Sequence, residues 1–258
     1  MIDPSDARPP FRQVADALRA AITSGVYGPG DKLPSARELA GEYEITHVTA
    51  SQAVAALKAE GLVESHVGRG VFVRAPADRR RIDRGRGVLS DERGYYFDAQ
   101  AKGWVALAPS VLYWGTAPAD VATLMGIEAD EPTFRRERNM GPPGSTFPLQ
   151  LATSYLPERI ARGTRLEERD TGPTGIYGLM EAAGHVLHWI EVCNARMPTP
   201  QERELLRLGD GVPVLRLLRV TRNQHGECLE VNDTRMSAER FEVSYRMDPS
   251  RLDGRLVI

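Results

Sequence analysis

Apolar residues recur at every third or fourth position near the start of the chain. The apolar positions of residues 11–22 predict an amphipathic helix, and Gly25 marks its end. Ser35 and Glu38 then form the S-x-x-E pattern of a capping box, in which each side chain accepts a hydrogen bond from the other residue's backbone amide. A second, shorter helix is therefore expected to begin just after Ser35.

A third helix and a hairpin follow with little chain between them. Thr46 is placed to cap a helix that runs to about Glu60 and has an inward apolar stripe. Residues 62–73 are typical of two short strands joined by a glycine-rich turn. Three short helices followed by a hairpin make a winged helix-turn-helix, a fold that places its third helix in the DNA major groove.

The face of the third helix opposite its apolar stripe is polar, which suits contact with base edges. A three-helix bundle with a solvated polar face is the alternative. Arg69 counts against it, because a cation between two glycines at a hairpin tip can reach phosphates or a narrow minor groove. The candidate DNA-contacting residues of the third helix and the wing are Thr46, His47, Thr49, Ser51, Gln52, Gly68, Arg69 and Gly70.

Three longer motifs occupy the same stretch. They are residues 30–40 (GDKLPSARELA), 59–63 (AEGLV) and 68–73 (GRGVFV). With these motifs in this order, residues 11–73 resemble the GntR family of bacterial transcription regulators. The resemblance implies that Arg37, at the start of the second helix, contacts DNA together with the third helix and the wing.

One departure from the family pattern bears on the DNA sequence that is bound. The family's third helix commonly opens with Ser-Arg-x-Thr-x-Arg, whereas residues 46–51 are THVTAS, so both arginines are replaced. Arginine bidentate to guanine is the commonest specific base contact and is worth about 1–3 kcal/mol. We therefore expect an altered operator preference, with more weight on Arg37, Gln52 and Arg69.

Length and composition favour a soluble protein of two domains. A chain of 258 residues is long for one domain, and 41% hydrophobic with 26% charged residues is an ordinary globular composition. The N-terminus has no signal-peptide pattern, and no stretch approaches the roughly 20 apolar residues of a membrane span. We expect a cytoplasmic bacterial protein, associated with the nucleoid and without a membrane partner.

Charge and cysteine content qualify this picture only slightly. Residues 1–86 carry 13 Lys and Arg against 11 Asp and Glu, and residues 87–258 carry 20 against 24. A weakly basic portion thus precedes an acidic one. The excess of arginine over lysine has two alternative explanations, GC-rich coding and phosphate recognition. Cys193 and Cys228 are too few for a disulfide framework or a four-ligand zinc site, and we expect buried free thiols.

Residues 76–90 have the composition of a linker. Five arginines accompany Pro76, Gly85 and Gly87, with almost no apolar periodicity. The segment is either a solvated hinge or a basic strap that adds salt-sensitive affinity for phosphates. It separates an expected DNA-binding domain, residues 1–75, from a second domain, residues 91–258.

The second domain contains an internal repeat. The pattern of residues 118–138 recurs 81 residues later as residues 199–219, and each copy predicts a helix, a short loop and a strand. A second capping box begins at Thr199, and a turn leads each copy into a further extended segment, 147–155 or 228–236. Two such units place four antiparallel strands in one sheet with pseudo-twofold symmetry, and a ligand pocket at their junction is expected.

A further set of short motifs runs through the repeat. They are residues 124–127 (LMGI), 136–138 (RER), 154–157 (SYLP), 174–177 (TGIY), 213–216 (PVLR) and 229–230 (LE). In this order, within residues 95–247, they resemble the UTRA domain, the effector-sensing domain of the HutC branch of GntR regulators. The resemblance implies a chorismate-lyase-like α/β fold.

The same resemblance implies an effector site. Arg136 and Arg138 would bind an anionic group of the effector, although surface ion pairing with Glu137 or Glu230 is the alternative. Thr174, at a helix start, would add a hydroxyl and backbone amides for an anion, and Glu230 would accept from a hydroxyl or an amine. Sugar-phosphate sensors of the family carry a small hydroxyl residue where this chain has Tyr96, which disfavours a sugar phosphate and leaves open a larger or more aromatic ligand.

These observations predict an α+β protein with an N-terminal winged helix-turn-helix and a C-terminal chorismate-lyase-like α/β domain whose sheet is mostly antiparallel. The function expected is that of a homodimeric, ligand-responsive transcription regulator, most often a repressor in this family, that binds a pseudo-palindromic operator in double-stranded DNA. Its effector is expected to be a small molecule with an anionic group.

Two rival functions are a chorismate-lyase-like enzyme domain fused to a DNA-binding head and a regulator that binds pyridoxal phosphate. The first finds no G-x-S-x-G elbow, P-loop or metal constellation in the sequence. The second requires a Schiff-base lysine in a much longer domain, and Lys102 is the only lysine beyond Lys58. His185 and His188 lack a third ligand with suitable spacing, so we expect no enzyme activity, cofactor or metal.

Overall fold

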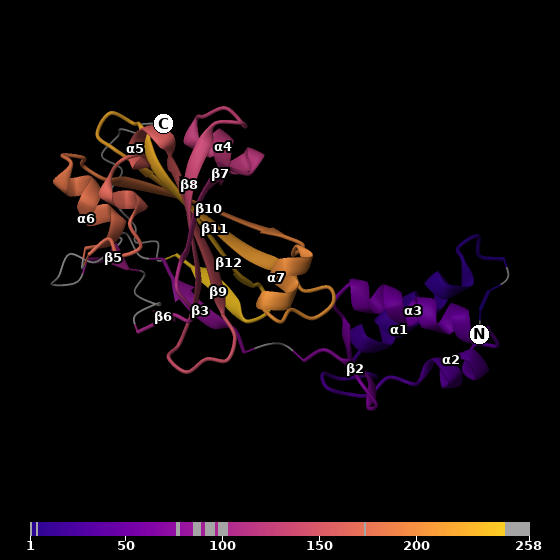
Figure 1. Cartoon of the computed structure of the whole chain (residues 1–258). Helices are drawn as coiled ribbons and strands as arrows, with labels where there is room; N and C mark the ends of the chain where they lie inside the picture. Colours follow the sequence, from indigo (N-terminus) through magenta and orange to yellow (C-terminus); the bar gives the residue numbers. More distant parts are fainter. Residues whose placement is uncertain are drawn as a thin grey trace, which may run out of the picture. The chain divides into compact units, whose positions relative to one another are not determined.

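Helices dominate the first part of the chain and strands dominate the rest (Figure 1). The chain divides into two compact units, one made of Met1–Asp78 with Met197–Pro213 and the other of Arg79–Arg196 with Val214–Ile258. The computed structural model describes residues 2–3, 5–75, 78–84, 89–90, 96–97, 103–172 and 174–245, and for 89–90 and 96–97 only the backbone.

The first unit contains the three helices and the hairpin that the apolar pattern predicts. These elements are α1 (Pro10–Thr23), α2 (Ala36–Glu42), α3 (His47–Ala59), β1 (Val63–His66) and β2 (Gly70–Val73). Their core is a single cluster in which Val14, Leu39, Ala53 and Leu57 are completely buried. The unit also contains α7 (Pro200–Leu205), where Thr199 and Glu202 form the predicted second capping box.

The helix starts are held by the side chains that the sequence indicates. Ser35 Oγ accepts from the Glu38 amide at 3.3 Å, and Glu38 Oε2 accepts from the Ser35 amide at 2.7 Å. Thr46 Oγ1 accepts from the Thr49 amide at 3.2 Å. Each bond satisfies an amide that a helix N-terminus would otherwise leave unpaired.

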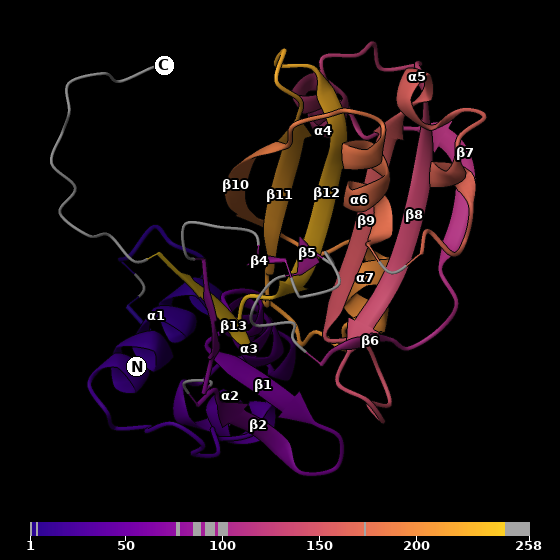
Figure 2. The same ribbon diagram turned by 90° about the vertical axis from the view of Figure 1, so that its left-hand side faces the viewer.

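The second unit is built on one seven-stranded sheet in the order β10-β11-β12-β9-β8-β6, with β7 also paired to β8 (Figure 2). The hairpins β8–β9 and β11–β12 are joined by the antiparallel pairing of β9 with β12, which confirms the four-stranded arrangement predicted from the repeat. The strands are β6 (Val105–Ala106), β7 (Val111–Thr116), β8 (Pro132–Gly141), β9 (Gln150–Pro157), β10 (His188–Arg196), β11 (Val214–Arg222) and β12 (Cys228–Ser237).

Helices cover the two faces of this sheet unequally (Figures 1 and 2). On one face, α4 (Ala119–Met125) buries Val121 and Met125 against β11 and β12. The other face carries α5 (Glu158–Ala161), the 3-10 turn η2 (Arg165–Glu167) and α6 (Gly175–Ala182), which share a core with β8, β9 and β12. The open part of that second face is the place available for a ligand.

A buried ion pair ties the two strands of the second hairpin together. Arg216 Nε and Nη2 lie 3.0 and 2.8 Å from the two carboxylate oxygens of Asp233, and both side chains are buried. Arg216 also binds Asp120 of α4. This bidentate geometry satisfies both buried charges and fastens α4 to the sheet.

The segment that composition describes as a linker contains a strand. Residues of β3 (Arg80–Asp83) pair in parallel with β13 (Phe241–Ser244), and Ile82 is buried. The buried Ile82 shows that this part of the segment is not fully solvated, which the sequence did not reveal because a four-residue strand with one apolar side chain leaves no periodic signal. Beyond it, β4 (Leu89–Ser90) pairs with β5 (Tyr96–Phe97).

The two cysteines differ in their environments. Cys228 is buried as expected, and burial raises the pKa of its thiol to about 11. Cys193 is exposed, so the expectation that both thiols are buried is wrong. Cys193 lies on β10, which is the end strand of the sheet among the described residues. Among the described residues, no helix is long and apolar enough to cross a membrane.

Two helical glycines are expected to respond oppositely to the same substitution. At Gly178 of α6, an added Cβ would overlap the Oγ1 and Cβ atoms of Thr174, whereas at Gly41 of α2 it would meet nothing within 4 Å. We expect Gly178→Ala to lower the free energy of unfolding by about 1–3 kcal/mol through overpacking. Gly41→Ala is expected to raise it by up to about 1 kcal/mol through helix propensity. Urea unfolding followed by circular dichroism measures both, and equal effects would contradict the packing of Thr174 over Gly178.

Candidate functional site

The candidate DNA-contacting residues divide into an exposed and a half-buried group. Arg37 lies in the first turn of α2 and is exposed, as are Thr46, His47 and Gln52 around the start of α3, whereas Thr49 and Ser51 are half-buried. The Thr46 hydroxyl caps α3 and lies 2.9 Å from the Thr49 hydroxyl. These two side chains therefore hold the start of the helix as well as bordering its outer face.

Sequence reasoning missed Val48. This residue is in the first turn of α3, and 65% of its surface is exposed although it is apolar. An exposed apolar side chain at the start of a recognition helix can contact the methyl group of thymine. The signal was available, because Val48 is the one apolar residue within the polar run at positions 46–49.

The wing is a tight turn that requires its glycines. Gly68 and Gly70 have φ angles of 73° and 118°, a region that other residues rarely adopt. Between them Arg69 is exposed, and its guanidinium lies 5.7 Å from the centre of the Phe72 ring. An added Cβ at Gly70 would come within 2.7 Å of Lys32 Cε, so Lys32 lies against the wing as a second cation that sequence reasoning did not single out.

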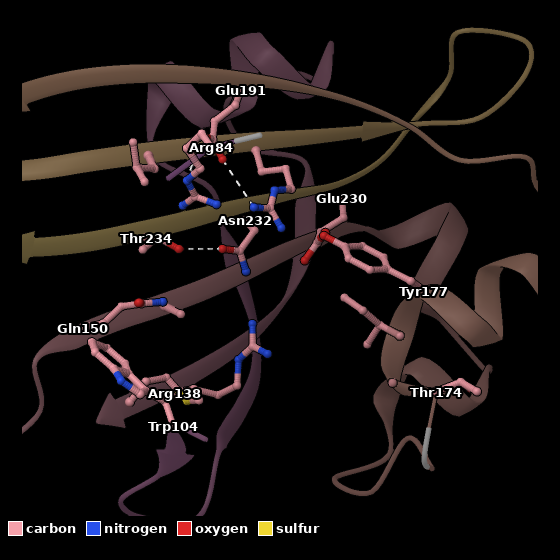
Figure 3. Close-up of a pocket in the computed structure, with 16 residues that line it drawn as sticks. Arg84, Trp104, Arg138, Gln150, Thr174, Tyr177, Glu191, Glu230, Asn232 and Thr234 are labelled. Atoms are coloured by element: carbon pink, nitrogen blue, oxygen red, sulfur yellow. Dashed lines mark hydrogen bonds and ion pairs between the residues drawn. The ribbon is translucent and has the colours of Figure 1, made fainter. Parts of the chain in front are cut away.

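A pocket of about 230 Å³ opens on the face of the large sheet that carries α6 (Figure 3). Its floor is formed by β8 to β12 and one wall by the start of α6. The lining residues are Arg84, Trp104, Arg138, Met140, Gln150, Ala152, Thr174, Gly175, Ile176, Tyr177, Glu191, Leu217, Arg219, Glu230, Asn232 and Thr234.

The register of the sheet explains why these side chains meet. Side chains alternate between faces along a strand, so residues paired across strands share a face. One row across the sheet consists of Arg136, Ser154, Asn232, Arg219 and Glu191. The neighbouring row consists of Arg138, Ala152, Thr234, Leu217 and Cys193. Charged groups from both ends of the sheet are thereby brought to one surface.

A chain of hydrogen bonds orients Arg138 in the pocket. Ser154 Oγ accepts from Arg138 Nη2 and from Asn232 Nδ2, both at 3.0 Å, and Asn232 Oδ1 accepts from the Thr234 hydroxyl at 2.9 Å. Because the guanidinium is held through one nitrogen, its remaining donors can face the cavity, as Figure 3 shows.

Glu191 stands between two arginines on the opposite side of the pocket. Its carboxylate oxygens lie 3.3 Å from Arg84 Nε and 3.4 Å from Arg219 Nη2. All three side chains are at most 19% exposed, so solvent screens these pairs only partly. The pocket therefore contains three arginines and two glutamates, Glu191 and Glu230.

Glu230 shares the pocket face of β12 with Asn232 and Thr234, and a β-bulge lies directly before it. Thr221 pairs with Glu230 and Arg222 with Cys228, so Leu229 is the extra residue of β12. Glu230 is 1% exposed, and its Oε2 accepts from the Thr221 hydroxyl at 3.1 Å. Its Oε1 is buried and has no hydrogen-bond partner among the described residues. A buried carboxylate oxygen without a donor is costly, so Oε1 is a candidate acceptor for a ligand group.

Tyr177 closes the pocket beside Glu230. Burial raises the pKa of the Tyr177 hydroxyl, and the negative charge of Glu230 raises it further. The tyrosine therefore keeps its proton at neutral pH. Its hydroxyl lies 3.4 Å from that of Thr221, so Tyr177, Thr221 and Glu230 form one polar group at the end of the cavity.

The start of α6 provides the wall nearest to Arg138 and Glu230. Thr174, Gly175 and Ile176 line the pocket, and Gly175 has a φ of 65°. The Thr174 side chain does not cap the helix. The first amides of a helix carry a partial positive charge, so this wall adds to the attraction that Arg138 exerts on an anion.

The structure brings together three of the five predicted effector residues: Arg138, Thr174 and Glu230. Arg136 is not among the lining residues. Its guanidinium donates to the carbonyl oxygens of Leu166 and Glu168 at 2.8 and 2.7 Å and is buried, so surface ion pairing does not describe it either. The side chain of Tyr96 lies outside the described residues.

Several pocket residues were not anticipated. Arg84 was counted with the linker, and Glu191 and Arg219 lie on strands whose register the sequence does not reveal. Trp104 precedes β6 and contributes an indole Nε1 that is buried without a hydrogen-bond partner among the described residues. The described residues contain no cluster of His, Cys, Asp or Glu suited to a metal ion.

Comparisons with known proteins address both units. Residues 10–73 match the family described as bacterial regulatory proteins, gntR family, and residues 112–242 match the UTRA domain. An HTH-type transcriptional regulator of Streptomyces coelicolor is 31% identical over 92% of this chain and 92% of its own. The HTH-type transcriptional repressor NagR of Bacillus subtilis is 24% identical over 93% of this chain and 95% of its own.

A solved structure supports the same relationship. A crystal structure of a GntR-family transcriptional regulator is similar with a TM-score of 0.65 and 26% sequence identity, covering 94% of this chain and 99% of that chain. The similarity extends over both the helical unit and the large sheet.

Two carboxylates of β12 are expected to differ when each is converted to its amide. Glu230→Gln removes a buried charge whose Oε1 has no donor, so the ligand-free protein should gain up to about 1 kcal/mol of unfolding free energy. Asp233→Asn breaks the buried pair with Arg216 and should cost about 3 kcal/mol. Urea unfolding of the ligand-free protein at pH 7 compares them. A loss for Glu230→Gln as large as that for Asp233→Asn would show that Glu230 serves stability rather than binding.

Proposed function

Because the chain belongs to the GntR family of bacterial transcription regulators and carries a UTRA domain, we propose that it is a homodimeric repressor controlled by an anionic small molecule. It is a ligand-responsive, DNA-binding regulator of transcription. The proposal adds the sign of the regulation, the oligomeric state and the chemistry of the effector. The observation that carries it is the pocket, where Glu230 Oε1 and the donors of Arg138 face one cavity.

On the DNA side, we propose that the start of α2, the first turns of α3 and the wing form the docking surface. Arg37 and Arg69 are exposed there, and Lys32 lies against the wing. They are placed to bind phosphates or guanine, while Gln52 and Val48 suit adenine and thymine. An operator half-site centred on A·T pairs follows from this set, since α3 carries no arginine.

Two heads in a dimer would read two half-sites about one helical turn apart, so the operator is proposed to be a pseudo-palindrome. We propose the domain boundaries 1–75, 76–90 and 91–258 for head, linker and sensor. The division of the compact units between Asp78 and Arg79 falls within this linker, whereas Met197–Pro213 belongs to the compact unit of the head. The protein is proposed to act in the cytoplasm, on the nucleoid, without an enzymatic reaction.

On the sensor side, the effector is proposed to combine an anionic group with a hydrogen-bond donor. Arg138 and the start of α6 would hold the anion, and Glu230 would accept from the donor, which is a hydroxyl or an ammonium group. Effector and operator would then oppose each other with equal coupling free energies, as linkage requires.

Arg37→Ala is expected to weaken operator binding without altering the fold. Loss of one base or phosphate contact worth about 1–3 kcal/mol raises Kd by roughly 5- to 150-fold. Fluorescence anisotropy with a labelled duplex from the region upstream of the protein's own operon measures this. The matched control is Arg12→Ala, which removes an exposed arginine of α1 outside the docking surface and should leave Kd within about twofold. No binding of the unaltered protein at low salt would contradict the proposed function.

Anionic metabolites that bind should lose their effect when Arg138 is neutralised. A thermal-shift screen of carboxylates and phosphates identifies ligands that raise the melting temperature of the unaltered protein. For each of them, Arg138→Gln is expected to weaken binding at least tenfold, because its guanidinium faces the cavity. Arg162→Gln is the control, since Arg162 is an exposed arginine of the same unit paired with Glu158. Equal binding by both variants would place the anion elsewhere.

A further inference from the structure

The strand β3 presents alternate residues to the sensor. Arg80 lies with its guanidinium carbon 5.2 Å from the centre of the Trp104 ring, Ile82 is buried in a core with β11 and β12, and Arg84 lines the pocket. The intervening Arg81 is exposed and pairs with Glu242. One face of this short strand thus packs against the sensor, and it reaches the pocket at Arg84.

The backbone of β3 is anchored at both ends. The Arg80 amide donates to the Arg240 carbonyl at 2.7 Å, and the Arg84 amide donates to the Ser244 carbonyl at 2.8 Å. Between these bonds the strand runs parallel to β13. Arg84 is therefore a side chain of the pocket and, at the same time, the end of a strand whose position is defined by hydrogen bonds.

The partner of Arg84 is the group that an anionic ligand would replace. Glu191 is shared between Arg84 and Arg219, at 3.3 and 3.4 Å, and only 11% of the Arg84 side chain and 17% of that of Glu191 are exposed. An anion entering the pocket offers both arginines a second negative group. A guanidinium that leaves Glu191 for the anion keeps its charge paired, and Glu191 keeps Arg219 as its partner.

We propose that Arg84 contacts the anionic effector from the side of the pocket opposite Arg138 and that β3 is the element through which pocket occupancy reaches the DNA-binding head. The inference rests on the proposed function and names the regulation of the same pocket. When the effector draws Arg84 from Glu191, the end of β3 moves with it, while Arg80 and Ile82 keep the strand attached. β2 of the wing ends at Val73 and β3 begins at Arg80, so only a short stretch of chain joins the two.

The choice of Arg84 over other arginines of the segment follows from its surroundings. Arg81 is 70% exposed and faces away from the pocket, so it cannot respond directly to a ligand there. Arg80 stacks on Trp104, a contact that an anion does not replace. Only Arg84, among the described residues of this segment, lines the cavity.

The experiment compares three variants of the full-length protein by amide hydrogen exchange. Arg84→Gln and Glu191→Gln each break the pair that holds the end of β3, and exchange in the peptide covering residues 78–84 is expected to be at least fivefold faster. Arg81→Gln, on the same strand but facing solvent, should exchange as the unaltered protein does. If Arg84→Gln fails to fold, the result for Glu191→Gln alone tests the proposal. The proposal is overturned if residues 78–84 exchange no faster in these two variants than in Arg81→Gln.

Orthophosphate is the probe for direct contact with an anion. At 50 mM, against chloride of equal ionic strength, it is expected to change the exchange rate of residues 78–84 at least twofold in the unaltered protein and to have no effect in Arg84→Gln. No response of the unaltered protein overturns the assignment of Arg84 as a binding residue. Neither exchange measurement requires DNA.

The DNA readout separates this inference from the proposed function. Arg84→Gln and Glu191→Gln should both change Kd for the upstream duplex at least threefold and in the same direction, with Arg81→Gln within twofold. If the unaltered protein does not bind the duplex, the proposed function fails while the exchange results still stand. If it binds and all three variants bind equally, the coupling through β3 is refuted while the proposed function survives.

Discussion

The antiparallel pairing of β9 with β12 is the constraint on which the sensor depends. It joins the two hairpins of the repeat and places Ser154 opposite Asn232 and Ala152 opposite Thr234. Because side chains alternate along each strand, that register also decides the face on which the charged residues of the outer strands stand. A slip of one residue between β9 and β12 would place Arg138 on the face opposite to that of Arg219 and Glu191, and the pocket would be lost. The backbone pairing of β9 with β12 therefore brings the pocket residues of the two hairpins to the same face.

One carboxylate on this face has the strongest indication of a ligand. Glu230 faces the pocket in register with Asn232 and Thr234, and its Oε1 has no donor among the described residues. Asp233, three residues further along the strand, is also buried but is bound by both nitrogens of Arg216. The contrast distinguishes a carboxylate that stabilises the sheet from one that is proposed to bind the effector.

Features that depend on neighbouring residues were predicted from the sequence, whereas contacts between residues far apart in the chain were not. The capping boxes at Ser35 and Thr199, the hairpin and the repeat depend on neighbouring residues, and all are present. Strand β3 could not be found, because its partner β13 lies far along the chain and its single apolar residue, Ile82, shows no period. Arg136 and Arg138 share a face two residues apart, yet only the loop carbonyls of Leu166 and Glu168 decide that Arg136 is a structural contact. For the docking surface, the comparisons establish the family, while the individual contacts stay predictions.

The distribution of arginine links the two halves of the molecule. The third helix lacks the two arginines of the family pattern, so the proposed docking surface would draw its specificity from short side chains and from two half-sites read together. Without those arginines each head of the proposed dimer is expected to bind DNA more weakly, and a small displacement that alters the spacing of the two heads would suffice to release the operator. The proposed exchange of partners at Arg84 would supply little free energy, and a weakly bound dimer would need little.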